Sequence, residues 1–308
     1  MGNEFKGQAA HSAEHFGDTR DHWWNLDFVR LMAKRWKLDA VRDVLDVGCG
    51  VGHWGMLLAS VMPEHARVTG IDREQSWVEQ ASARALARGL EGRFSYRQGE
   101  AQHLPFPDAS FDFTTCQTLL IHLPDPAAAI AEMLRVTRPG GLVAVAEPYN
   151  LTESLLLDSI SNQASVGEIV ELVRFQLTCE RGKVALGEGD NSLGDRVPGL
   201  FVAQGLADVE VYVNDKANAV FPPYAEGAQR AFTEDARDRL ARRLWHWSEA
   251  DARRLFLAGG GSEGDFAAQF ARGLAASENI VRGLNDGSYH GIVGGEFYLV
   301  AGRRPLTR

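Results

Sequence analysis

The stretch that decides the fold is VLDVGCGVG, residues 44–52, an apolar run that ends in a glycine-rich loop. An apolar run of this length that is followed by glycines is typical of a buried strand, and helical sequence follows to about Val61. Glycines let backbone N–H groups approach a ligand closely and permit positive φ angles. The N-terminus of the next helix favours anionic groups. The stretch therefore predicts a strand, a ligand-binding loop and a helix, in that order.

The same alternation continues along the chain. Apolar runs predict further strands at residues 67–72, 94–97, 111–116 and 142–146. Helical sequence lies between them. One helix is expected to end at Gly89, a favoured residue just past a helix, and another to start at Asp125-Pro126, an N-cap followed by proline. Strands separated by helices predict a parallel α/β sheet with helices on both faces. Ligands bind outside the carboxyl edge of such a sheet.

The flanking regions depart from this alternation. Residues 21–37 have helical spacing of apolar residues, whereas 151–182 and 225–285 look helical and are long for connections within a sheet. Two more strands are expected at 207–213 and 296–301. We therefore expect an N-terminal helical segment or lid over residues 1–40 and a ligand-binding core over 41–150. The rest of the sheet, with a helical cap, should occupy residues 151–308.

The composition limits the class of protein. Of 308 residues, 45% are apolar and 24% are charged, which argues against a disordered, collagen-like or coiled-coil chain. The net charge of 32 − 41 = −9 repels phosphate backbones, so no nucleic-acid partner is expected. The three cysteines form no CxxC pair, so we expect neither a metal site nor a disulfide framework. With no signal-type segment and no apolar run of 18 residues, a cytoplasmic protein without a membrane partner is expected.

Two classes of ligand compete for the glycine loop, dinucleotides and S-adenosylmethionine. The dinucleotide fingerprint GxGxxG requires a third glycine at the position of His53. Asp46, at the entry of the loop, fits a cationic ligand better than a phosphate, and S-adenosylmethionine carries an ammonium and a sulfonium. Asp72, at the end of the second strand, can accept both ribose hydroxyls, which suits either class. These residues favour S-adenosylmethionine and leave a nicotinamide-dependent oxidoreductase as a distant alternative.

Five motifs now occur in order: VLDVGCGVG (44–52), GID (70–72), GEAQHLPFPDASFD (99–112), CQTLLIHLPDP (116–126) and LRVTRPGGLVAVAEP (134–148). Together they resemble the successive motifs of class I S-adenosylmethionine-dependent methyltransferases. They are most similar to the ubiquinone/menaquinone C-methyltransferase-like (methyltransferase type 11) branch of small-molecule enzymes. The resemblance covers about residues 40–150. It implies a Rossmann-like, mostly parallel sheet of seven strands in the order 3-2-1-4-5-7-6, with strand 7 antiparallel.

The resemblance also implies which residues hold the cofactor, S-adenosylmethionine. Asp46, Gly48 and Gly50 would line its methionine part. Asp72 would hold the ribose, and Arg73 would pack beside the adenine. The remaining cofactor residues are Cys49 in the loop, Glu100 and Ala101 at the adenine, and Gln117 at the methionine carboxylate or the methyl group. Many relatives have Asp at the position of Glu100.

The acceptor is expected at the same edge of the sheet. The candidate catalytic residues follow the fourth and fifth strands: His122, Glu147 and Tyr149. A general base is needed only if the acceptor must lose a proton, so a structural histidine and a structural hydrogen bond from Glu147 remain alternatives. The candidate substrate contacts are His22, Trp23, Trp24 and Asn150, with helix packing as the alternative for both tryptophans. Other residues that could line the site are Arg20, Trp245, His246, Trp247, Tyr289 and His290.

The predicted function is methyl transfer to a small organic acceptor, with release of S-adenosylhomocysteine, by a monomer or homodimer. The alternatives are an RNA or protein methyltransferase and a non-catalytic S-adenosylmethionine-binding protein. One arginine cluster could bind an anionic acceptor or RNA: Arg237, Arg239, Arg242, Arg243, Arg253 and Arg254. Because acidic residues are interleaved with these arginines, a solvated helix face is the favoured interpretation.

Overall fold

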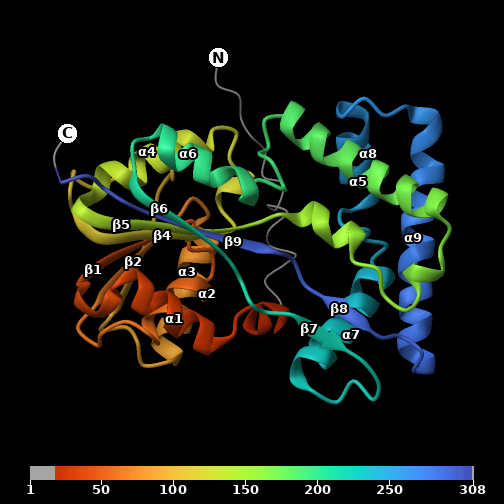
Figure 1. The fold of residues 1–308 in the computed structure, drawn as a ribbon, viewed down its shortest axis with the longest axis horizontal. Coiled ribbons are helices and arrows are strands. Elements are labelled where there is room, and N and C mark those ends of the chain that lie inside the picture. The colour runs from red at the N-terminus through yellow and green to blue at the C-terminus, as the bar shows by residue number, and fades with distance from the viewer. Residues whose placement is uncertain (1–17, 307–308) are drawn as a thin grey trace.

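A computed structural model of the chain describes residues 18–306. Its main sheet has seven strands in the order β3-β2-β1-β4-β5-β9-β6 (Figure 1). Their bounds are β1 Asp43–Val47, β2 Arg67–Asp72, β3 Phe94–Gln98, β4 Phe111–Gln117, β5 Thr137–Pro148, β6 Ala207–Val213 and β9 Phe297–Arg303. The first five strands pair in parallel, whereas β9 runs antiparallel to both of its neighbours. The Rossmann-like α/β fold, the strand order and the antiparallel last strand are confirmed.

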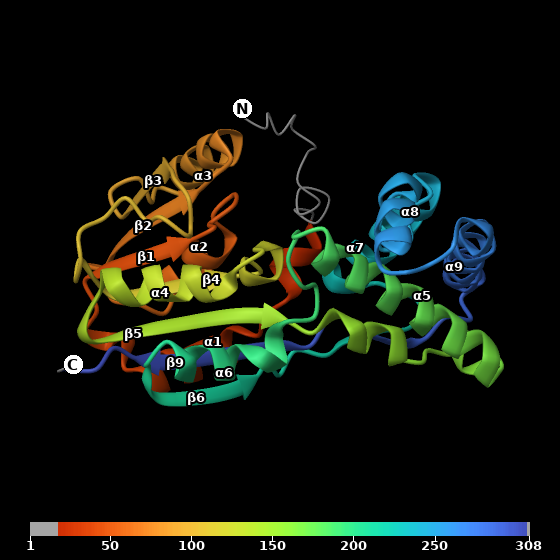
Figure 2. The ribbon, with the colours of Figure 1, turned by 90° about the horizontal axis from the view of Figure 1, so that it is seen from above.

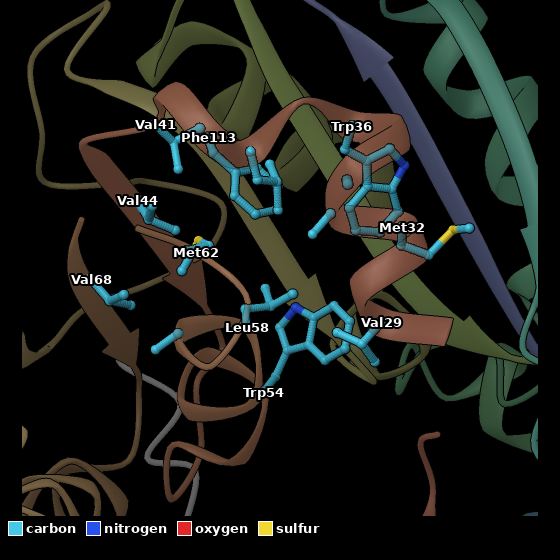
Figure 3. Packing of buried hydrophobic residues seen from close by; sticks show 14 of the residues in the cluster. Val29, Met32, Trp36, Val41, Val44, Trp54, Leu58, Met62, Val68 and Phe113 are labelled. Atoms are coloured by element: carbon cyan, nitrogen blue, oxygen red, sulfur yellow. The ribbon is translucent and has the colours of Figure 1, made fainter. Parts of the chain in front are cut away.

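Helices cover both faces of this sheet (Figure 1). One face carries α1 (Leu26–Trp36), α2 (His53–Ala59) and α3 (Gln75–Ala87), and the other carries α4 (Pro126–Val136) and α6 (Val197–Ala203). Figure 3 shows the first of these two cores, in which Trp36 of α1 and Trp54 of α2 lie over the sheet. The rings of Trp36 and Phe113 have their centroids 6.3 Å apart. Strands buried by helices on both sides read as continuous apolar runs, which explains why the sequence locates them.

Local signals set the ends of these helices. Asp125 accepts a hydrogen bond from the backbone N–H of Ala128 (3.1 Å), and Pro126 occupies the first turn of α4. The α3 helix ends just before Gly89, whose φ of +66° suits a residue without a side chain. Both boundaries agree with the expectation from sequence.

Four helices form a cap beyond the carboxyl edge of the sheet: α5 (Val166–Ala185), α7 (Gly227–Ala241), α8 (Glu249–Ala258) and α9 (Glu263–Asp286). Figure 2 shows the arrow of β5 pointing toward this cap. The cap has its own core, in which the rings of Phe175 and Trp245 stack with centroids 4.7 Å apart. A Cβ on Gly182 of α5 would lie 1.7 Å from the carbonyl oxygen of Leu255, so α5 and α8 touch backbone to backbone.

Two expectations for the flanking regions are wrong in detail. The predicted helix at 151–182 is two short 3-10 helices, η5 (Asn150–Leu155) and η6 (Ser161–Gln163), followed by α5. The continuous helix breaks because Asp158 accepts the N–H groups of residues 160 and 161 through its side chain, a local bond that competes with helix formation. The predicted helix at 21–37 begins only at Leu26, after a 3-10 turn at Asp18–His22.

The two short strands β7 (Asn218–Val220) and β8 (Gly291–Val293) form a separate ribbon that the sequence did not predict. The expected lid over residues 1–40 is described only from residue 18, and its first 17 positions lie outside the described residues. None of the helices within residues 18–306 has the length and apolarity that crossing a bilayer requires.

Candidate functional site

The glycine loop follows β1 at the carboxyl edge of the sheet. Gly48, Gly50 and Gly52 have φ angles of +65°, +51° and +85°, which residues with side chains rarely adopt. A Cβ on Gly48 would lie 2.6 Å from Cδ1 of Leu119, so this position also lacks space for a side chain. The loop therefore needs its glycines for both backbone conformation and packing.

Asp72 ties this loop to the end of β2. Its Oδ2 accepts a hydrogen bond from the backbone N–H of Gly50 (2.9 Å), and its Oδ1 accepts one from the N–H of Glu74 (3.0 Å). Burial raises the pKa of this carboxyl, and the two N–H groups oppose that effect. Each oxygen retains a lone pair, so the carboxylate can still accept a hydroxyl. Asp72 thus organises the loop in addition to the ribose-binding role that the sequence suggests.

Asp46 lies beneath the same loop and is almost completely buried. Its Oδ2 accepts the N–H of Gly55 in the first turn of α2 (3.0 Å), whereas its Oδ1 has no hydrogen-bond partner among the described residues. Burial raises the pKa of the carboxyl to about 7, the N–H of Gly55 opposes this, and the charge of Asp72 adds to it. A buried carboxylate with a free acceptor oxygen beside the loop suits a ligand that carries an ammonium group. The negative charge of Asp46 would attract this group without direct contact.

The other predicted cofactor residues lie on the same carboxyl edge. Arg73 and Glu100 are exposed, and Arg73 forms an ion pair with Glu74 (3.4 Å). Ala101 and Gln117 are partly buried. Burial raises the pKa of the Cys49 thiol well above its usual value, which fits a packed apolar group better than a nucleophile. The parallel register brings the ends of the strands, and so these residues, to one side of the sheet.

A cavity of about 570 Å³ lies between this edge and the cap. It has the size of a typical small-molecule site. Several predicted acceptor-side residues line it: Arg20, His22, Trp23, His122, Asn150, Trp245, His246, Trp247 and Tyr289. The lining does not include Trp24, Glu147, Tyr149 or His290. Trp24 packs instead against the rings of Trp54 and Phe297, with centroids 5.1 and 5.6 Å away, so the packing alternative describes it better than a substrate wall.

Glu147 is fully buried at the end of β5. Its Oε1 accepts the N–H groups of Leu119 and Leu120, both at 2.9 Å, and its Oε2 accepts that of Ile121 at 3.4 Å. Burial raises the pKa of this carboxyl to about 7, against the effect of the three N–H groups. The geometry favours the structural hydrogen bond over a role as base, because the carboxylate is occupied by the segment that carries His122.

Lys183, from the cap, holds the same segment from the other side. Its Nζ donates to the carbonyl of Ile121 (3.1 Å) and to Oδ1 of Asn191 (3.2 Å). Burial lowers the pKa of this ammonium to about 8. Sequence reasoning missed Lys183, since it lies one residue beyond the helix predicted at 151–182, and a lysine at such a position gives no signal that it is buried.

Four charged residues of the cavity wall were not predicted to line it: Glu153 of η5, Asp158, and Asp235 and Arg239 of α7. For the arginine cluster as a whole, the sequence favours a solvated helix face. That interpretation fits Arg242, which pairs with Asp238 at 3.2 Å, and Arg253, which pairs with Glu263 at 2.7 Å. Arg239, one turn along the same α7 helix, faces the cavity instead.

Comparison with known proteins agrees with this geometry. Residues 45–145 match a family model described as "Methyltransferase domain". Methyltransferase GfsG from Streptomyces halstedii is 40% identical over 114 residues, which are 37% of this chain and 40% of that protein. A demethylmenaquinone methyltransferase from Geobacillus kaustophilus is 35% identical over 124 residues, 40% of this chain and 51% of that protein. The aligned part thus spans about half or less of these relatives.

Among solved structures, the YcgJ protein from Bacillus subtilis superimposes with a TM-score of 0.52 at 20% identity. The match covers 91% of this chain and 99% of that one. At this identity the likeness concerns the fold alone. The sequence matches fall on the strands and loops that form the glycine-loop site. Residues 45–145 are thus similar in sequence to a methyltransferase domain, and the chain shares its fold with solved structures such as that of YcgJ.

Proposed function

We propose that the chain is an S-adenosylmethionine-dependent methyltransferase that acts on a small organic acceptor in the cavity between sheet and cap. One observation carries the proposal. The positive-φ glycine loop is fastened by Asp72 at the carboxyl ends of β1 and β2, and the cavity begins beside the ends of β4 and β5, at His122 and Asn150. The loop proposed for the nucleoside and the cavity proposed for the acceptor lie at the same edge of the sheet, which supports methyl transfer between them.

The chain's own residues would bind and orient the cofactor, which supplies an activated methyl group when bound. Asp72 would accept the ribose hydroxyls through its remaining lone pairs. The Ala101 N–H and the Glu100 carboxylate would contact the adenine, and the backbone around Gly48 would lie along the methionine part. The assignment of these roles rests on the family resemblance and on their shared position at the sheet edge.

On the acceptor side, the protein would mainly align the acceptor and exclude water. Trp23 and the cap helices would close the cavity around it. His122 is the candidate that could take a proton or orient the acceptor, because its side chain lines the cavity. Glu147 and Lys183 would act as positioning residues, since they hold the backbone of the segment that presents His122. Tyr149 adjoins this edge without lining the cavity, so its catalytic role has the weaker support.

The walled cavity favours a small acceptor over RNA or protein. An RNA or protein acceptor needs an open surface. The surface arginines Arg242 and Arg253 are already paired with carboxylates. The names of the relatives, one of which is a demethylmenaquinone methyltransferase, also support small-molecule chemistry. They leave the acceptor of this chain open.

The test starts with titration calorimetry of S-adenosylhomocysteine and NAD. We expect the first to bind and the second not to bind. Asp72→Ala should weaken S-adenosylhomocysteine by about 10- to 100-fold, since hydrogen bonds to a charged group contribute about 1.5–3 kcal/mol each. Glu79→Ala, an exposed change on α3, is the matched control and should bind normally.

Because Asp72 also holds the loop, Asp72→Asn and a circular dichroism spectrum should accompany the alanine variant. Binding of NAD in preference, or unchanged S-adenosylhomocysteine affinity in both Asp72 variants with a folded protein, would overturn the proposal. An acceptor library that follows S-adenosylhomocysteine release then tests turnover. Binding without turnover across that library would favour the non-catalytic alternative.

A further inference from the structure

The cavity wall contains three charged side chains that make no hydrogen bond and no ion pair in the part of the chain that the structure describes. Glu153 lies on η5, and Asp235 and Arg239 lie one turn apart on α7. The charge of Arg239 acts on both carboxyls without a direct contact. Buried or enclosed charges are normally hydrogen-bonded, so the two carboxylates retain acceptor capacity for a ligand.

Glu153 shows this lack of hydrogen-bond partners most clearly. Surrounding protein raises the pKa of its carboxyl, although the charge of Arg239 opposes this effect. A large part of the side chain nevertheless remains accessible. Both observations hold if the accessible part faces the cavity rather than bulk solvent. The backbone of the neighbouring Gly295 leaves room for the carboxylate, since a Cβ there would lie 3.1 Å from Oε1 of Glu153.

The net charge of this part of the wall is negative. Burial also raises the pKa of the Asp235 carboxyl, and Arg239 again acts on it in the opposite direction. Among the charged residues that line the cavity, the carboxylates of Glu153, Asp158 and Asp235 outnumber the guanidinium groups of Arg20 and Arg239 by one. The other arginine of the wall, Arg20, lies over the ring of Trp23 and is influenced by Arg84 of α3.

The remaining wall is largely apolar. Leu156, Leu157 and Ile292 line the cavity with 45%, 47% and 55% of their surface accessible, although these residue types are normally buried. Aromatic rings stand on other sides, among them those of Trp23 and Phe232. Apolar surface that remains accessible inside a cavity is stabilised when an apolar ligand covers it.

We infer that the acceptor is a mainly apolar, ring-sized molecule that carries a basic nitrogen, and that the carboxylate of Glu153 binds this nitrogen, with Asp235 as a second negative charge on the same wall. The inference rests on the proposed function and specifies the chemistry of its acceptor site. The ammonium or amine donates to the Glu153 carboxylate, which accepts no hydrogen bond from the described residues, and the apolar body covers the leucine and isoleucine side chains. An acceptor with a carboxylate in this position would face the excess negative charge, so it would be rejected. Asp235 and Arg239 belong to the cap, so this selectivity is a property of the cap rather than of the sheet.

The experiment uses three probes with the same ring system: 2-naphthylmethylamine, 2-naphthylmethanol and 2-naphthoate. Their affinities are measured by calorimetry on the full chain, with and without saturating S-adenosylhomocysteine. We expect the amine to bind at least tenfold more tightly than the alcohol and the carboxylate to bind most weakly. Glu153→Gln should weaken the amine about tenfold and change the alcohol less than twofold. Asp235→Asn should act in the same direction if Glu153→Gln fails to fold.

Glu234→Gln is the matched control, because Glu234 is exposed, is next to Asp235 on α7 and is not part of the cavity wall. It should leave all three affinities unchanged. The inference is overturned if the alcohol or the carboxylate binds as tightly as the amine, if Glu153→Gln weakens amine and alcohol equally, or if no probe binds. Failure of S-adenosylhomocysteine itself to bind would count against the proposed function instead, and the amine preference would still be measurable without it.

Discussion

The sheet and the cap of this protein differ in how their charged residues are used. In the sheet, Asp72 and Glu147 bind backbone N–H groups and fix loops at the carboxyl edge. At the cavity, Glu153 of η5 and Asp235 of the cap helix α7 accept no hydrogen bond from the residues that the structure describes. The first arrangement stabilises a framework, whereas the second leaves groups available to a ligand. Under the proposed function, this difference means that the sheet would supply the site for the cofactor and the cavity wall at the cap would supply the selectivity for the acceptor.

The largest effect should follow from separating these two regions. Gly182→Ala places a Cβ 1.7 Å from a backbone oxygen of α8, so α5 and α8 must move apart and the cap should lose about 3 kcal/mol or more of stability. S-adenosylhomocysteine affinity, measured by calorimetry, should stay within about threefold, because the site proposed for it lies on the sheet. Gly167→Ala, on the same helix but in open space, is the control and should stay within about 1 kcal/mol of the parent in urea unfolding.

A simultaneous loss of cofactor affinity and cap stability in Gly182→Ala would show that the two regions fold as one unit. The comparison between them would then have to be abandoned.

A smaller effect concerns the sheet side and its pH dependence. The pKa of Glu147 rises from 4.5 in the unfolded chain to about 7 in the folded protein. The folded state therefore holds this proton more tightly, and its stability falls as pH rises from about 4.5 to about 7. Glu147→Gln should reduce the stability difference between pH 5 and pH 8, seen in urea midpoints, by about 2 kcal/mol.

The pKa of Asp46 also rises to about 7. Asp46 is present in both the parent protein and the Glu147→Gln variant, so the pH dependence that remains in the variant serves as the internal reference. An unchanged pH dependence in Glu147→Gln would mean that Glu147 is not the group that titrates. As a positioning residue, Glu147 should also affect the rate of transfer more than the affinity for S-adenosylhomocysteine.

The smallest effect is expected on the outer surface of the cap. Arg253 pairs with Glu263 at 2.7 Å, and both side chains are more than half exposed. Arg253→Ala should change the free energy of unfolding by less than about 0.5 kcal/mol, because solvent screens such pairs. Its affinity for the naphthyl probes should equal that of the parent. A clear drop in probe affinity would extend the acceptor site to a surface that we assign to solvent alone.

Much of the sheet could be predicted from the sequence. The strand at 67–72 and the strand at 207–213 have the predicted bounds, and the strand order follows from the family motifs. Within the predicted cofactor set, the residues lie together on one edge, because parallel strands end on the same side. The acceptor side was less accessible to prediction. His122 and Trp23 line the cavity as expected, whereas Trp24 packs into the core and the carboxylate of Glu147 holds a loop.

The sequence by itself determined the alternation of strands and helices, the glycine loop and the carboxylate that ends β2, because each depends on residues close together in the chain. Only the tertiary structure decided which charged residues are used. Glu153 and Arg239 are 86 positions apart in sequence (239 − 153). The residues around each of them in the sequence are typical of an ordinary polar surface. Whether such a group meets solvent, a backbone N–H or a cavity depends on how α7 and η5 are placed around that cavity, and no local sequence pattern encodes their arrangement.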